Sequence, residues 1–282
     1  MVPARRLSAV WYVLGSIVAV QVGAAFAKGI FGQVSPTAMT WLRLVFSAAV
    51  LLPLARPRLR GRSRADWLVL LGYSCCLVAM NWAIYQAFHR IPLGLAVTIE
   101  FLGPLTVAAV TSRSRRDVGF ALLAGAGVAV LGFTPTDLDL IGVGLAGLAG
   151  VAWAGYIVAS PSLAVRWRSA EGVALASLYG AVVLAAPAVV TGGPGLLDLR
   201  VLGTAALVAI LSSVIPFTLE LAALRILPRR VFAVLMSLEP AAAAVAALLV
   251  LGERLSLADL VAMTCVVAAS VGITRAAGQR TA

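Results

Sequence analysis

Long apolar runs, separated by short polar segments, make up most of the sequence. A run of about 20 apolar residues is long enough to cross a bilayer as a helix. We place ten such runs at 7–28, 36–55, 67–87, 91–111, 118–134, 140–159, 171–191, 201–223, 231–251 and 256–274. The segments between them are too short to form a separate soluble domain. The pattern therefore predicts an all-α integral membrane protein with ten transmembrane helices.

The amino-acid composition supports this class. Of the 282 residues, 62% are hydrophobic and 12% are charged, whereas about a quarter of the residues in soluble domains are charged. The mean hydropathy is +1.03. These values exclude a soluble globular domain.

The positive charges follow the predicted loops. The net charge of +11 would by itself suggest an acidic partner. However, 17 of the 22 Lys and Arg residues lie at the two termini or in the second, fourth, sixth and eighth loops, and only three lie in the loops between these. Basic loops are retained in the cytoplasm. We therefore predict both termini in the cytoplasm, an even number of spans and no nucleic-acid partner.

Prolines indicate an internal duplication. Pro92 and Pro104 are twelve residues apart, as are Pro228 and Pro240, and a single offset of 136 superposes the two pairs. The segment FHRIP before the first pair corresponds to LRILP before the second. Such self-similarity indicates that each half of the chain is one copy of a unit.

The two copies, residues 1–137 and 138–282, are predicted to lie inverted in the membrane. Each contains five of the ten predicted spans, and an odd number of spans makes the second copy enter from the opposite side. Inverted repeats around a site at the membrane midplane are typical of secondary transporters. The organisation therefore favours a transporter that works by alternating access.

The fourth span carries a carboxylate, Glu100, near its midpoint. A charge at this depth is costly, so such groups line a pathway or are paired inside the bundle. Pro104 removes the hydrogen bond that would use the carbonyl of Glu100. The ninth span repeats this device with Glu239 and Pro240, although the two glutamates are not equivalent under the offset. We expect both glutamates to bind substrate or protons, and both prolines to break their helices.

Three polar residues in the first two spans are further candidates. Gln21 and Lys28 are seven residues apart and share a helix face, and Lys28 is the only lysine of the chain. We interpret Lys28 either as part of the transport site or as a side chain that snorkels to the outer surface. Arg43 lies deep in the second span, where it would either pair with a carboxylate or bind the anionic group of a substrate.

Polar and aromatic residues also occur in the third and sixth spans. Asn81 and Tyr85 are one helical turn apart, and at their depth they would either line a cavity or pack against neighbouring helices. Trp153 and Tyr156 in the sixth span are interpreted as packing residues.

The eighth span carries Ser212, Pro216 and Glu220 at four-residue steps. Pro216 frees the carbonyl of Ser212 and so predicts a second kinked helix. Glu220 would either take part in transport or pair with Arg225 or Arg229 near the end of the span.

Several segments resemble a known family. They are QVGAAFAK in the first span, MNWAIY in the third, IPLGLAVTIEFLGPL in the fourth, PFTLEL in the eighth and LMSLEPAAAAVAALLVLGE in the ninth. Together with the duplication, they are similar to the EamA-type members of the drug/metabolite transporter superfamily, and in particular to the bacterial branch that exports threonine and homoserine. The resemblance covers nearly the whole chain. It implies a protein of the bacterial cytoplasmic (inner) membrane with ten helices and both termini in the cytoplasm. It also implies efflux of small metabolites coupled to the proton gradient.

The candidate residues of the spans include both of the charges that bind a zwitterionic amino acid. Its ammonium requires an anion and its carboxylate requires a cation, and the chain offers Glu100 and Glu239 against Arg43 and Lys28. We expect Glu100 to bind a proton and the substrate ammonium in turn, so that proton entry promotes amino-acid exit. Glu239 is the second candidate for this role.

Other functions compete with this one. The same architecture would suit export of drugs or other metabolites, and bulky cations would favour the aromatic residues over Arg43. A non-transporting membrane receptor or scaffold has no positive signature in the sequence. Neither HExxH nor GxSxG occurs, and the single histidine, His89, does not make a multi-histidine metal site. We expect no enzymatic activity, no metal and no cofactor.

Overall fold

The described part of the molecule is a bundle of helices. The computed structural model describes residues 2–112, 115–130 and 139–279, and within these ranges no residue belongs to a strand. The α-helices are α1 (Val2–Gly29), α2 (Pro36–Ala55), α3 (Arg64–Arg90), α4 (Leu93–Glu100), α5 (Leu102–Ser112), α6 (Arg115–Val130), α7 (Leu140–Arg166), α8 (Ser169–Val183), α9 (Ala185–Gly192), α10 (Leu199–Ala209), α11 (Ile215–Leu224), α12 (Arg229–Met236), α13 (Glu239–Ala246) and α14 (Leu257–Gln279). A 3-10 helix, η2 (Gly193–Leu197), and two π-helical turns, η3 (Ile210–Val214) and η4 (Ala247–Leu251), complete the order. The predicted all-α class is confirmed for these residues.

The number of spans is smaller in the described residues than the sequence predicts. Eight segments are long and apolar enough to cross a membrane, and α8 with α9, bent by 53°, makes nine if this pair is one span. The remaining predicted span, 118–134, overlaps α6, of which 16 residues are described. Residues 131–134 lie outside the described ranges. The count of ten helices and the inversion of the repeats stay predictions.

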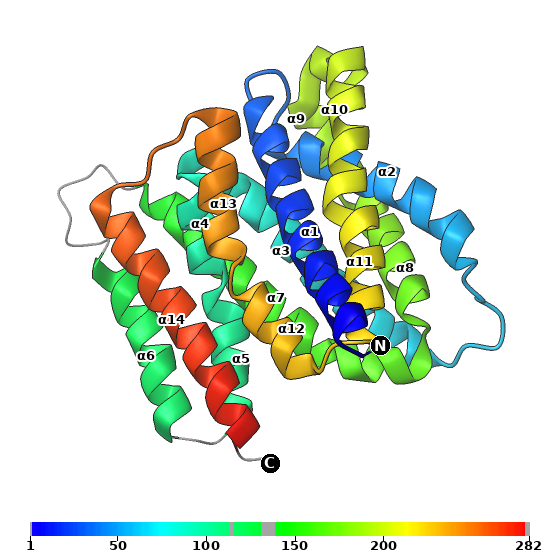
Figure 1. The fold of residues 1–282 in the computed structure, drawn as a ribbon. Coiled ribbons are helices and arrows are strands. Elements are labelled where there is room, and N and C mark those ends of the chain that lie inside the picture. The colour runs from blue at the N-terminus through cyan, green and yellow to red at the C-terminus, as the bar shows by residue number, and fades with distance from the viewer. Residues whose placement is uncertain (1, 113–114, 131–138, 280–282) are drawn as a thin grey trace.

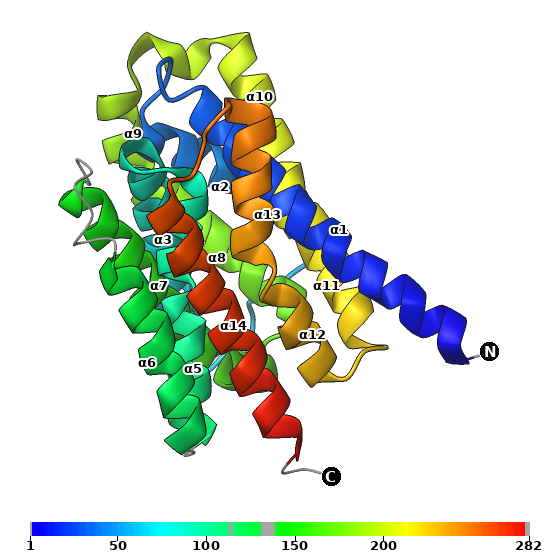
Figure 2. The same ribbon diagram turned by 60° about the vertical axis from the view of Figure 1, so that its left-hand side comes forward.

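Helices that are distant in the sequence lie side by side. α6 runs next to α14, and α1 runs next to α11, in both views (Figures 1 and 2). α3 packs along α7, and α2 packs along α8. Each of these pairs joins a helix of the first half of the chain to one of the second half, so the two halves form a single interleaved bundle.

Small side chains allow this close packing. The largest buried cluster contains many alanines, among them Ala24, Ala38, Ala87, Ala146 and Ala243. Inside a membrane, apolar burial does not favour protein over lipid, so helix association depends on close contact between backbones. An alanine-rich interior provides this contact.

Two predicted spans are broken near their centres. α4 and α5 meet at Phe101, and α12 and α13 meet at Ser237 and Leu238. The capping residues Phe101 and Ser237 are separated by the same offset of 136 as the prolines, and Pro104 and Pro240 follow them by three residues. Both breaks therefore lie within one turn of a proline, which cannot donate a backbone hydrogen bond.

The eighth span contains a third irregularity, the π-helical turn η3 between α10 and α11. Pro216 occupies the first turn of α11, where it cannot donate to the carbonyl of Ser212. That carbonyl instead accepts a hydrogen bond of 3.4 Å from Nη2 of Arg43. π-helical turns of this kind occur frequently at functional sites.

Two glycines let the break between α4 and α5 lie directly against α7. A Cβ added to Gly150 would lie 2.7 Å from the carbonyl oxygen of Glu100, and one added to Gly103 would overlap the carbonyl of Gly150. Neither position tolerates a side chain unless the backbones move apart. The packing of α7 therefore sets the backbone position of Glu100.

We expect Gly150→Ala to destabilise the protein by about 1–3 kcal/mol, the usual cost of overpacking. Gly147→Ala, in the same helix, is the matched control, because a Cβ there meets no atom within 4 Å. Thermal unfolding of the detergent-solubilised variants measures both effects. Equal melting temperatures would contradict the close contact between α7 and the helix break.

Candidate functional site

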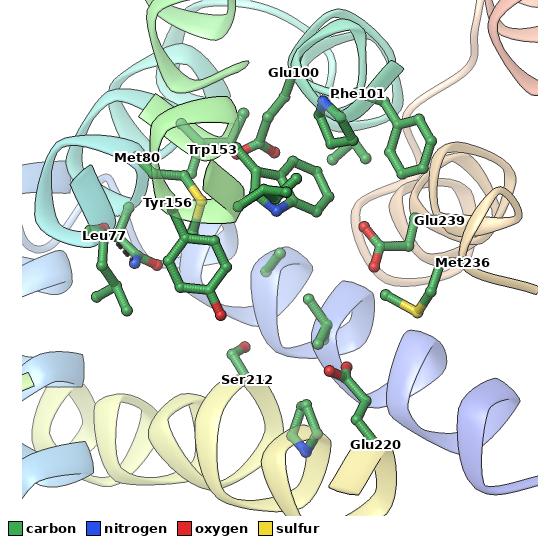
Figure 3. A pocket seen from close by; sticks show the side chains of 18 of the residues that line it. Leu77, Met80, Glu100, Phe101, Trp153, Tyr156, Ser212, Glu220, Met236 and Glu239 are labelled. Carbon is green, nitrogen blue, oxygen red and sulfur yellow. Dashed lines mark hydrogen bonds between the residues drawn. The ribbon is translucent and has the colours of Figure 1, made fainter. Parts of the chain in front are cut away.

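A cavity of about 500 Å³ lies within the bundle (Figure 3). Sites for small molecules in proteins typically have volumes of about 300–1,000 Å³. Its walls come from both halves of the chain, including α1 to α5, α7, α8, η3 and α11 to α14. The residues predicted from the sequence that line it are Gln21, Arg43, Asn81, Tyr85, Glu100, Pro104, Pro216, Glu220 and Glu239.

Three carboxylates face the cavity from different helices. Figure 3 shows the side chains of Glu100 from α4, Glu239 from α13 and Glu220 from α11 directed toward the same space. Glu100 and Glu239 are each only 7% exposed. Like charges repel strongly where the dielectric constant is low, so this arrangement requires cations or protons at the site. Among the described residues, no group of His, Cys, Asp and Glu side chains is placed to hold a metal ion.

Glu220 is held by a hydroxyl group. Its Oε1 accepts a hydrogen bond of 2.6 Å from Oγ of Ser16 in α1. The ion pairs between described residues do not include one with Arg225, and the side chain of Arg229 lies outside the described set. The hydrogen bond to α1 leaves Glu220 at the cavity wall.

Arg43 reaches the cavity from α2 without a carboxylate partner. Its Nη1 donates to the hydroxyl of Tyr85 at 3.3 Å and its Nη2 to the carbonyl of Ser212. Its buried Nε has no hydrogen-bond partner. None of the ion pairs found between described residues includes Arg43. Among these residues Arg43 therefore forms no direct ion pair, although Glu100 lines the same cavity and interacts with it electrostatically. Its unpaired Nε can still donate a hydrogen bond to an anion.

Two further buried polar atoms at the cavity have no partner, Oε1 of Gln21 and Oγ of Ser212. Gly23 brings α1 so close to Ser212 that an added Cβ would overlap this hydroxyl. An unsatisfied buried polar group costs about 1–3 kcal/mol, and in a cavity it is available to a polar ligand. Asn81, in contrast, donates from Nδ2 to the carbonyl of Leu77 at 2.7 Å.

Aromatic side chains form another part of the wall. Trp153 and Tyr156 line the cavity together with Phe101 (Figure 3). Trp153 also packs edge-on against Phe101 with ring centres 5.5 Å apart, and Tyr156 lies 4.9 Å from the ring of Tyr73. The packing interpretation of Trp153 and Tyr156 is thus incomplete, because these rings pack on one side and border the cavity on the other. Their spacing of three residues, which places them on one helix face, is the signal that identifies them.

Lys28 lies outside the cavity, at the end of α1. Its Nζ forms an ion pair with Oε1 of Glu253 and donates to the carbonyl of Ile91 at 2.8 Å. The other carboxylate oxygen of Glu253 accepts from the backbone N–H of Leu93 at 2.9 Å. Gly252, with a φ of 69°, turns the chain after η4 as a left-handed helix cap. We call this set of contacts, which joins α1, α4 and the segment after η4, the Lys28–Glu253 latch.

The latch changes the interpretation of Lys28. The lysine neither lines the cavity nor extends freely into the surroundings, because a specific carboxylate holds it.

Pro240 also lies outside the cavity lining. Glu253 is a residue that the sequence analysis missed, and its signal is a charge directly after the ninth span, beside a glycine.

The chain is similar to known transporters over most of its length. The EamA-like transporter family matches residues 7–134 and 140–275. "Threonine/homoserine exporter RhtA" of Salmonella typhimurium (strain LT2) is 36% identical over 258 residues, which cover 90% of this chain and 87% of the relative. "Threonine/homoserine exporter RhtA" of Escherichia coli (strain K12) is 36% identical over 264 residues, which cover 93% and 89%. A protein crystal structure with 20% identity superposes with a TM-score of 0.67 and covers 98% of this chain and 99% of its own.

The apolar helical segments and the match with the EamA-like transporter family define a multi-pass helical membrane protein of the transporter class. The chain belongs to the EamA-like transporter family. The family and the relatives are transporters and not enzymes. The match with the crystal structure supports the fold alone.

We expect the latch to be stronger than an exposed ion pair. The coupling between Lys28→Met and Glu253→Gln should be about 1 kcal/mol or more, because both side chains are partly buried and also hydrogen-bonded to the backbone. The more exposed pair Arg90 and Asp139 is the comparison, with an expected coupling of about 0.5 kcal/mol or less. Thermal unfolding of the single and double variants gives both values. Equal coupling energies for the two pairs would show that the latch is no stronger than an exposed ion pair.

Proposed function

We propose that this transporter exports small zwitterionic amino acids, such as threonine and homoserine, across the bacterial inner membrane in exchange for protons. The observation that carries the proposal is one cavity that contains an arginine without a carboxylate partner and three carboxylates. A zwitterion needs both signs of charge in one site. The names of the two relatives, which describe threonine/homoserine exporters, support this choice of substrate.

In the proposed complex, the substrate carboxylate binds Arg43, whose Nε is unpaired. The ammonium binds Glu100 or Glu239. The hydroxyl of threonine or homoserine then bonds to Oε1 of Gln21 or Oγ of Ser212, which lack other partners. A site that is built to bind a hydroxyl discriminates against analogues without one, because its buried polar groups would stay unpaired.

Coupling to protons follows from competition for the same carboxylates. The substrate ammonium and a proton each neutralise one carboxylate, and an empty site with all three ionised would be costly at this depth. Release of the amino acid on the outer side therefore favours uptake of a proton before the empty site becomes exposed to the cytoplasm again. Glu100 is the first choice for this exchange and Glu239 is the second.

Alternating access is proposed to use two inverted five-helix repeats, residues 1–137 and 138–282, with both termini in the cytoplasm. The breaks at Phe101 and Ser237 are related by the repeat offset, and broken helices at the repeat interface are typical of such transporters. Paired hinges at these breaks would let each repeat adopt the conformation of the other.

This conformation is proposed to face the cytoplasm. The cavity reaches Phe232 of α12 and Thr274 near the end of α14, toward the end of the bundle where α1 begins (Figure 2). The Lys28–Glu253 latch joins helices at the opposite end. The latch would then close the outer end while substrate enters from inside.

A second candidate function is export of a bulky organic cation. The aromatic wall of Phe101, Trp153 and Tyr156 favours it, because aromatic faces attract cations and the carboxylates would neutralise the charge. In that case the positive charge of Arg43 would repel the cationic substrate. The response of transport to loss of Arg43 separates the two candidates.

We expect Arg43→Ala to weaken threonine export at least about thirtyfold, because loss of a buried charge pair costs about 2 kcal/mol or more. Efflux of labelled threonine and homoserine from preloaded cells measures the effect, with Arg90→Gln at the exposed pair as the control. Retained amino-acid efflux would contradict the proposal. Faster efflux of tetraphenylphosphonium, without any amino-acid transport by the unmodified protein, would favour the second candidate.

We expect Glu100→Gln to abolish the stimulation of threonine transport by a proton gradient, because the amide neither takes up a proton nor pairs with an ammonium. Transport into inverted vesicles with and without a gradient measures this. Asp139→Asn, which removes a carboxylate outside the cavity, should leave the stimulation unchanged. If the stimulation by the gradient is lost in Glu239→Gln but not in Glu100→Gln, proton coupling would be assigned to Glu239. Unchanged stimulation in both variants would contradict the mechanism.

A further inference from the structure

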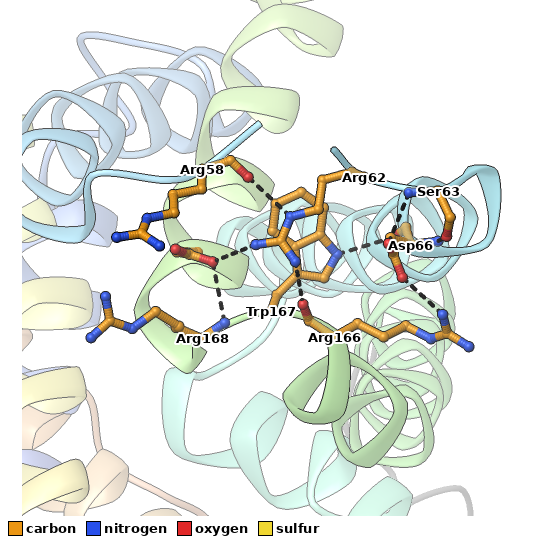
Figure 4. A network of polar contacts seen from close by, with 8 residues as sticks. Arg58, Arg62, Ser63, Asp66, Arg166, Trp167 and Arg168 are labelled. Carbon is orange, nitrogen blue, oxygen red and sulfur yellow. Dashed lines mark hydrogen bonds and ion pairs between the residues drawn. The ribbon is translucent and has the colours of Figure 1, made fainter. Parts of the chain in front are cut away.

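A second pocket lies at the junction between the α2–α3 loop and the α7–α8 turn (Figure 4). Its volume is about 390 Å³. The lining contains four arginines and one carboxylate, together with three apolar side chains: Arg58, Arg62, Arg166, Arg168, Glu171, Ala164, Val165 and Trp167. Together these side chains give the pocket a net positive charge.

Arg62 lines this pocket and is held in place by several contacts. Its guanidinium lies 4.0 Å from the ring centre of Trp167, and Nε donates to the carbonyl of Arg58 at 3.0 Å while Nη1 donates to the carbonyl of Arg166. Nη2 pairs with Glu171 at 3.2 Å, and Glu171 is only 1% exposed. Arg62 and Glu171 therefore neutralise each other and hold the two loops together.

Two other arginines remain without such a partner. Arg166 pairs with Asp66 at 2.8 Å. Arg58 and Arg168 take part in none of the ion pairs found between described residues, and Figure 4 shows their guanidinium groups on the same side of the pocket. The pocket thus presents, on one side, two arginines that form no ion pair with a described residue.

Apolar surface adjoins these charges. Val165, which lines the pocket, is 89% exposed. Trp67 packs edge-on against Trp167 with ring centres 5.4 Å apart and is itself 42% exposed. Tryptophan at the end of a span is typical of the membrane interface. A soluble anion would leave this apolar surface in water, whereas a lipid would cover it with its acyl chains.

We propose that this pocket binds the phosphate group of an anionic membrane lipid. Arg58 and Arg168 contact the phosphate, and the acyl chains lie over Val165 and Trp67. Basic pockets between helices at the membrane surface are known to suit lipid headgroups. The bound lipid would add a further contact between the α2–α3 loop and the α7–α8 turn, and so stabilise the junction of the two halves of the chain.

The test compares lipid retention by the purified full chain. Native mass spectrometry counts phosphatidylglycerol molecules that stay bound after extraction from phosphatidylcholine bilayers made with and without phosphatidylglycerol. We expect retained phosphatidylglycerol, and Arg58→Gln/Arg168→Gln should weaken its binding about thirtyfold, since each arginine near the surface contributes about fivefold. The double variant Arg60→Gln/Arg64→Gln is the matched control, because it removes the same charge from exposed residues outside the pocket.

Three outcomes would overturn the proposal. Equal weakening in the two double variants would show attraction by net charge and no specific site. If the unmodified chain retained no phosphatidylglycerol, the pocket would not be a binding site for this lipid. Stabilisation by inorganic phosphate in a thermal shift assay, equal to that by phosphatidylglycerol and lost in the Arg58/Arg168 variant, would assign the pocket to a free phosphate compound.

Discussion

The cost of placing ionised groups in the hydrocarbon layer governs the interior of this protein. Each buried charge needs an opposite charge, a hydrogen bond or water. The chain gathers Glu100, Glu220, Glu239 and Arg43 around one cavity instead of distributing them along separate helices. Only part of their requirement is met from within, because Glu220 has a hydroxyl partner and Arg43 has neutral ones. The proposal that a charged substrate and protons bind here rests on the part that is not met by these partners.

Irregular backbone brings these groups to the cavity. Glu100 is the last residue of α4, and Glu239 is the first residue of α13, so each carboxylate lies beside a helix break. The π-helical turn before Pro216 similarly frees the carbonyl of Ser212 for Arg43. In a membrane, such breaks are tolerated only where protein or a water-filled space satisfies the backbone. The helix breaks and the cavity therefore depend on each other.

Separate polar contacts hold the two ends of the bundle. At one end, the Lys28–Glu253 latch joins α1 and α4 to the segment after η4. At the other end, Arg62 joins the α2–α3 loop to the α7–α8 turn (Figure 4). Both sets connect the first half of the chain to the second. The two sets share no residue, so the two ends of the bundle are held by independent contacts.

The protein class, most of the helices and most of the polar residues of the cavity can be predicted from the sequence. Apolar runs predict helices because an unpaired backbone is too costly in lipid, and Pro104, Pro216 and Pro240 predict irregular helices because proline lacks a donor in any surroundings. Glu100 and Glu239 stand out because charges are rare in apolar runs. These are local properties of the chain, and no knowledge of its neighbours is needed to recognise them.

Contacts between residues that are distant in the sequence depend on the tertiary structure. It paired Lys28 with Glu253, left Arg43 without a direct ion pair to a described residue and placed Trp153 and Tyr156 at the cavity wall. The sequence does not define these partners, because lipid is as apolar as a neighbouring helix and hydrophobic pattern therefore does not specify which helices lie side by side. Small-residue contacts such as the one between Gly103 and Gly150 make that choice, and they depend on the approach of two backbones that are distant in the sequence.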